Sequence, residues 1–79
     1  MASKTYNGHR NWKFWNVSLW IANDEGLYNT ARTCKAVGKT SARAAELFIE
    51  AMTEAGRSKT PDGAPYSKSA VRAAIAGLE

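Results

Sequence analysis

The chain contains a single cysteine, Cys34, and a single histidine, His9, among its 79 residues. One cysteine cannot form an intramolecular disulfide, so a disulfide-stapled secreted fold is excluded. The two residues together are also too few for the usual ligand set of a zinc site. No run of 18 or more apolar residues is present, and the N-terminus lacks the apolar region of a secretion signal. These absences predict a cytoplasmic protein that has no metal, no other cofactor and no association with a membrane.

The sequence also lacks a recognisable catalytic arrangement. His9 lies in a polar stretch with no evident partner. Glu46, Glu50 and Glu54 recur every four residues, a spacing that is typical of the solvated face of a helix. General acid–base catalysis needs groups whose pKa values are shifted by a cleft, and no pattern here indicates one. We therefore expect that the protein is not an enzyme.

Composition is that of an ordinary small globular protein, with 44% hydrophobic and 23% charged residues. The length allows one domain with a small core. The formal net charge is +4 and the isoelectric point is about 9.5. A positive balance of this size favours an anionic partner, although it also serves solubility.

The segment 11–28, NWKFWNVSLWIANDEGLY, holds all three tryptophans. As a strand, it would place alternate apolar residues on one face, namely Trp15, Val17, Leu19 and Ile21. As a helix, it would have two apolar stripes, one with Trp12, Trp15 and Leu19 and the other with Phe14, Val17 and Ile21. We favour the helix, because Asn11 is a good N-cap and no hairpin partner of matching character follows. A helix that is apolar on most sides should be nearly surrounded by other elements.

Capping signals divide the rest of the chain into three more helices. Asn23 is expected to cap the second, which ends at Gly38, and Thr40 or Ser41 the third, which runs to about Ala55. Gly56 is expected in the C′ position of the third helix. Residues 57–66 read as a loop with a Pro-Asp-Gly turn, and Ser67 caps a short last helix.

These patterns predict an all-α fold, with a polar N-terminal arm over residues 1–10 and one helical domain over residues 11–79. About four short helices would pack around the aromatic first helix. The third and fourth helices do not match a helix-turn-helix, because the loop between them is about ten residues instead of three or four.

A basic run without an acid follows the aromatic segment, and it comprises Arg32, Lys35, Lys39 and Arg43. These cations could contact phosphates or a carboxylate-rich surface. Trp20 lies off both apolar stripes of the first helix, and tryptophan, tyrosine and arginine are the usual anchors of protein interfaces. The candidate partner-binding residues are therefore Trp20, Tyr28, Arg32, Lys35, Lys39 and Arg43.

The run N-W-x-x-W-N-V-x-L-W-I-x-N-D-E-G-L-Y resembles a small, largely uncharacterised family of phage and mobile-element proteins. The similarity extends from Asn11 to Tyr28, about a quarter of the chain. The resemblance implies a phage or prophage accessory protein. It implies no catalytic residue, because the activity of that family is not settled.

Small proteins of this origin often inhibit host defence, and anti-CRISPR proteins are the best-known class. The first functional hypothesis is thus an anti-CRISPR-type inhibitor in the host cytoplasm, which binds a host protein or ribonucleoprotein defence complex and blocks target DNA recognition without catalysis. A basic chain argues against mimicry of DNA. The alternative hypothesis is a small basic nucleic-acid-binding accessory or regulatory protein.

Overall fold

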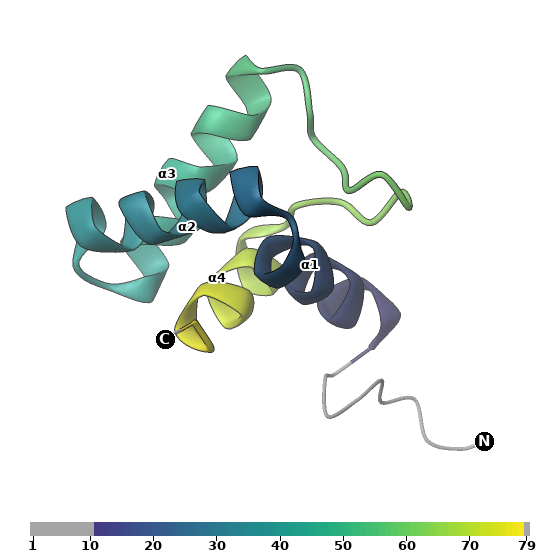
Figure 1. Cartoon of the computed structure of the whole chain (residues 1–79), viewed down its shortest axis with the longest axis horizontal. Helices are drawn as coiled ribbons and strands as arrows, with labels where there is room; N and C mark the ends of the chain where they lie inside the picture. Colours follow the sequence, from purple (N-terminus) through teal and green to yellow (C-terminus); the bar gives the residue numbers. More distant parts are fainter. Residues whose placement is uncertain (1–10, 79) are drawn as a thin grey trace.

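The computed structural model describes residues 11–78, which form a small all-α domain (Figure 1). Within this part of the chain there are four helices and no strand: α1 (Trp12–Asn23), α2 (Glu25–Gly38), α3 (Ser41–Glu54) and α4 (Lys68–Ala76). The all-α prediction, including the helical alternative for residues 12–22, is confirmed. The expected polar arm, residues 1–10, lies outside the described residues. None of the described helices is long and apolar enough to cross a membrane.

Each helix begins at a side chain that accepts a hydrogen bond from the backbone N–H three residues further on. The four N-caps are Asn11, Asp24, Thr40 and Ser67. The prediction of Asn23 as the second cap was wrong by one residue, because α1 continues through Asn23. The Asn23 amide donates instead to the Leu19 carbonyl at 2.9 Å, and the Asp24 carboxylate accepts from the Leu27 amide at 3.0 Å.

The second helix ends at Gly38, as predicted, and this glycine is needed for close packing and not for a left-handed backbone. It is the last residue of α2, and the left-handed conformation falls on Lys39, with φ of 68°. A Cβ at Gly38 would lie 2.9 Å from the Ala44 backbone nitrogen. The missing side chain therefore allows the start of α3 to approach the end of α2. Gly56 does have a positive φ, 75°, as predicted.

All four helices contribute side chains to one core, in which α4 packs against both α1 and α3 and α2 packs against α3 and α1. The bulkiest fully buried apolar side chains of this core are Phe48, Ile21, Ile75, Val17 and Val71. Leu19 belongs to an apolar stripe of a helix that we expected to be nearly surrounded and so to the core, but it is 36% exposed. The physical reason is that α1 lies beside α2 and α4 and not beside α3, so part of its surface is left uncovered.

The loop between α3 and α4 is fixed to α1 by a buried polar contact. Asn16, only 1% exposed, accepts a 2.6 Å hydrogen bond from the Thr60 hydroxyl and donates one of 2.9 Å to the Asp62 carboxylate. The Thr60 hydroxyl oxygen also accepts from the Ala64 amide at 3.0 Å. These bonds hold the loop against α1, and the loop in turn forms one wall of a cleft.

Candidate functional site

Four of the six predicted binding residues follow one flank of α2 and its C-cap, and we call them the α2 basic stripe: Tyr28, Arg32 and Lys35 in the helix and Lys39 at the C-cap. The spacing of four and three residues places Tyr28, Arg32 and Lys35 on one side of α2, and Lys39 follows just after the last residue of the helix. The buried residues of α2, Ala31 and Cys34, lie on a neighbouring side that faces the core. The helix thus presents a cationic flank while its adjacent face packs inward.

The side chains of the α2 basic stripe are ordered by local contacts. Arg32 Nη1 donates to the Tyr28 hydroxyl at 3.0 Å, and its guanidinium carbon lies 5.6 Å from the centre of the Tyr28 ring. Lys35 Nζ donates to the Leu78 carbonyl at 3.1 Å, which places the stripe beside the end of α4. Lys39 is exposed.

None of the three cations of the α2 basic stripe has an ion-pair partner among residues 11–78. Both ion pairs in this part of the chain involve Glu46, which contacts Arg43 at 2.9 Å and Lys68 at 2.7 Å. The hydrogen bond from Lys68, followed by that from Arg43, lowers the pKa of the Glu46 carboxyl. The Arg43 charge is therefore offset on α3, so Arg43 does not extend the unpaired stripe.

Trp20, the sixth predicted residue, is held in a different group. Its indole Nε1 donates to Asp62 Oδ2 at 2.9 Å, which joins α1 to the loop. Tyr28 and Arg32 pair with each other, so Trp20 is not part of that pair. Hydrogen bonds from Asn16 and then from Trp20 lower the pKa of Asp62.

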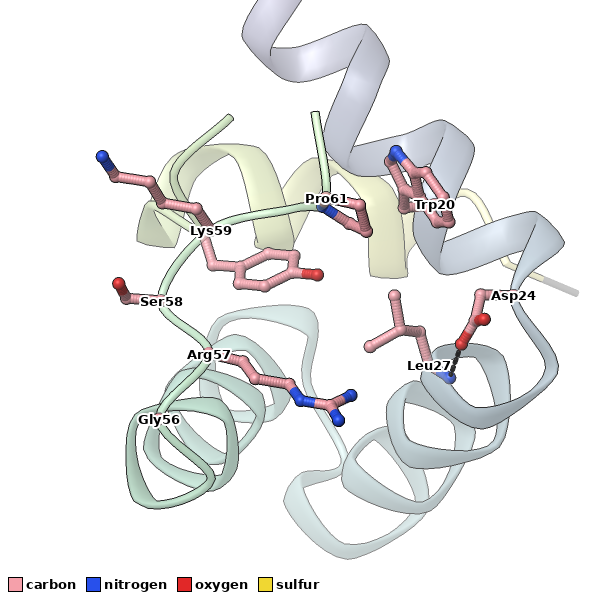
Figure 2. Close-up of a pocket in the computed structure, with 9 residues that line it drawn as sticks. Trp20, Asp24, Leu27, Gly56, Arg57, Ser58, Lys59 and Pro61 are labelled. Atoms are coloured by element: carbon pink, nitrogen blue, oxygen red, sulfur yellow. Dashed lines mark hydrogen bonds between the residues drawn. The ribbon is translucent and has the colours of Figure 1, made fainter. Parts of the chain in front are cut away.

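A cleft of about 420 Å³ opens between the start of α2 and the loop that follows α3 (Figure 2). One wall is formed by Trp20, Asp24 and Leu27, and the other by residues 56–59 together with Pro61 and Tyr66. No sequence pattern indicated this cleft, because its two walls lie far apart in the chain and Arg57 and Lys59 belong to a segment that was predicted only as a loop.

Tyr66 is the buried member of the cleft, with 7% of its surface exposed. Its ring packs edge-on against Phe48, with 5.5 Å between the ring centres. Burial raises the pKa of the Tyr66 hydroxyl; the Asp24 carboxylate raises it further, and Arg57 opposes them. The hydroxyl is thus close enough to both charged side chains for each to act on it.

The remaining reactive group is the thiol of Cys34, which is buried in α2. Burial raises its pKa, which disfavours the nucleophilic thiolate at neutral pH. Over residues 11–78, no group of three or more histidine, cysteine, aspartate or glutamate side chains is arranged to hold a metal ion.

Together, these features describe a small all-helical protein with a cationic helix flank and a separate cleft. The chain belongs to a family of unknown function, DUF7249, whose family model matches residues 2–78. No curated protein and no solved structure matches the chain.

Proposed function

We propose that this protein binds nucleic acid through the α2 basic stripe and acts without catalysis. The observation that carries the proposal is that Arg32 and Lys35 on one flank of α2, and Lys39 at its C-cap, have no acidic partner among residues 11–78. Arg32 and Lys39 are seven residues apart, which corresponds to about 10 Å along a helix. A DNA duplex presents about six phosphates over that length.

The charges on α3 indicate which helix faces the nucleic acid. The helices α2 and α3 are joined by only two residues, Lys39 and Thr40, and they diverge from this turn (Figure 1). In a helix-turn-helix protein the second helix enters the major groove. The exposed side of α3, however, carries three glutamates, Glu46, Glu50 and Glu54. Phosphates would be repelled there, so contact through α2 to the backbone, without base readout, is favoured.

The test compares two double variants with the same change in net charge. Arg32→Glu/Lys39→Glu reverses the stripe, whereas Lys13→Glu/Arg72→Glu reverses two exposed cations on α1 and α4. Binding to a mixed-sequence DNA and RNA panel is measured over a series of salt concentrations. With about three phosphate contacts, log K should fall with log salt at a slope of about −2 to −3.

The stripe variant should lose this binding and its salt dependence, and the control should keep most of both. Equal losses in the two variants would show that only net charge matters. Absence of measurable binding by the unmodified protein at low salt would reject the proposal.

A second candidate is an anti-CRISPR-type inhibitor that uses the same stripe on a ribonucleoprotein defence complex in the host cytoplasm. It is supported by the Tyr28–Arg32 pair, because these are residue types that anchor protein interfaces, and by the resemblance of residues 11–28 to phage proteins. Its test is protection of a CRISPR-targeted phage by the unmodified protein, with loss of protection in Tyr28→Ala/Arg32→Ala. No protection, together with no recovery of an effector complex, would reject this candidate.

A further inference from the structure

The cleft between Trp20 and Arg57 lies at the start of α2 and is separate from the α2 basic stripe, which runs toward the other end of that helix. Its volume of about 420 Å³ is in the range of small-molecule sites. Apolar surface comes from Trp20, Leu27 and Pro61, and Figure 2 shows the Trp20 ring beside Pro61 above the opening. The cleft thus has a flat apolar wall that could receive a planar group.

The Tyr66 hydroxyl is a hydrogen-bonding group without a protein partner in this cleft. The residue is 7% exposed and lines the cleft. Among residues 11–78, no buried side-chain oxygen or nitrogen lacks a hydrogen-bond partner, so the Tyr66 hydroxyl, which has no bond within this part of the chain, reaches the open space of the cleft. A ligand atom that accepts a hydrogen bond could take the place of water at this hydroxyl.

Arg57 supplies the positive charge. Its backbone is fixed after Gly56 by a 2.8 Å hydrogen bond to the Met52 carbonyl, and its side chain extends into the cleft toward Leu27 (Figure 2). It has no ion pair within the described residues. Lys59 points away from this space (Figure 2), so it adds long-range attraction and not a direct contact.

Asp24 makes one wall of the cleft acidic, whereas Arg57 makes the other wall basic. The Asp24 carboxylate is already used as the N-cap of α2, where it accepts from the Leu27 amide and its charge is balanced by the helix dipole. An anionic group would avoid Asp24 and lie at Arg57. A guanidinium can form two parallel hydrogen bonds with either a carboxylate or a phosphate, because both groups offer paired oxygens.

We propose that this cleft binds a small molecule that carries a carboxylate or phosphate on a planar apolar ring. The anionic group pairs with the Arg57 guanidinium and accepts a hydrogen bond from the Tyr66 hydroxyl, while the ring contacts Trp20 and Leu27. This site is independent of nucleic-acid binding by the α2 basic stripe.

The test is a titration of isotope-labelled protein, followed by amide and indole NMR signals. The probes are phenyl phosphate, benzoate and the uncharged benzyl alcohol. The two anions should cause saturable shifts in residues 56–59 and in the Trp20 indole N–H, and the tighter of the two identifies the head group. Benzyl alcohol should bind at least about tenfold more weakly, because it makes no charge-assisted hydrogen bond.

Three single variants distinguish direct contacts with Arg57 and Tyr66 from a general attraction of anions to a basic protein. Arg57→Gln should weaken binding of the tighter anion about tenfold or more, and Tyr66→Phe, which keeps the ring, should weaken it several-fold. Arg72→Gln, which removes an exposed cation of α4 that does not line this cleft, should leave the affinity unchanged. The proposal is overturned by non-saturating shifts, by equal binding of benzyl alcohol, or by equal affinities in Arg57→Gln and Arg72→Gln.

Discussion

Trp20 and Asp62, 42 residues apart, are joined by a 2.9 Å hydrogen bond from the indole N–H to Asp62 Oδ2. The same oxygen accepts a hydrogen bond from Asn16 at 2.9 Å. One carboxylate in the loop thus receives two side chains that are one helical turn apart on α1. The polar residues of the aromatic segment therefore serve first to fix the fold, which changes the interpretation of Trp20 from a free interface ring to an anchor of the loop.

The buried amide of Asn16 should contribute strongly to stability. Replacing it with alanine removes its bonds to Thr60 and Asp62 and leaves a void in a site that is 1% exposed. We expect Asn16→Ala to lower the free energy of unfolding by about 1–3 kcal/mol. Urea denaturation measures this, with the exposed Asn29→Ala as control, for which we expect less than about 0.5 kcal/mol. Equal effects of the two substitutions would contradict this role.

Stability should fall in acid partly because of Asp62. The pKa of the Asp62 carboxyl is lowered in the folded state by the hydrogen bonds from Asn16 and Trp20. The ionised carboxylate therefore stabilises the folded state fully above its unfolded pKa of about 4. This stabilisation is lost as the pH falls through the lower pKa of the folded state. Thermal unfolding from neutral pH to about pH 3 should show a smaller decrease in Tm for Asp62→Asn than for the unmodified protein.

Glu46 contributes in the same pH range and with the same sign, since its pKa is also lowered, first by Lys68. The decrease in Tm between neutral pH and about pH 3 is therefore also measured for Glu46→Gln, which shows how much of it comes from Glu46. If Asp62→Asn has the same acid sensitivity as the unmodified protein, the hydrogen bonds to its carboxylate do not stabilise the folded state.

The close approach at Gly38 predicts opposite effects for two glycines of one helix. Gly38→Ala would place a Cβ 2.9 Å from the Ala44 backbone nitrogen, and we expect a loss of about 1–3 kcal/mol. At Gly26 the added Cβ would meet only the Asp24 side chain, at 3.4 Å. Gly26→Ala should be neutral or stabilise by up to about 1 kcal/mol. Denaturation of both variants checks the pair, and a neutral Gly38→Ala would contradict the packing.

The thiol of Cys34 should react slowly in the folded protein. It is buried and its pKa is raised by that burial, so little thiolate is available at neutral pH. A thiol-specific reagent should modify it much more slowly in buffer than in denaturant. Equally fast modification in buffer would show that α2 opens readily from the core.

Sequence patterns predicted the helices because helix formation depends on local signals. Asn11 and Ser67 were identified as caps from their neighbours alone, and the third cap was narrowed to Thr40 or Ser41, of which the structure shows Thr40. Leu19 was misplaced because exposure depends on which helices cover α1, and helical spacing does not contain that information. The partner of Asn16 was invisible for the same reason, since Thr60 lies 44 residues away.

The candidate sites show the same difference between features that depend on neighbours in sequence and features that depend on distant contacts. The α2 basic stripe could be predicted from spacing because three of its residues share one helix and the fourth, Lys39, is the C-cap of that helix. Arg43 was grouped with them by sequence, although Glu46 neutralises it on the next helix. The cleft with Arg57 and Tyr66 depends on how the loop returns to α1, and therefore only the structure reveals it.

Nucleic-acid binding by the α2 basic stripe can be mapped by titrating isotope-labelled protein with a short mixed-sequence duplex and following the amide chemical shifts. We expect the largest shifts between Tyr28 and Lys39, and we expect them to decrease steeply as salt is raised. Shifts that are absent at low salt, or that are largest on the glutamate side of α3, would contradict this binding.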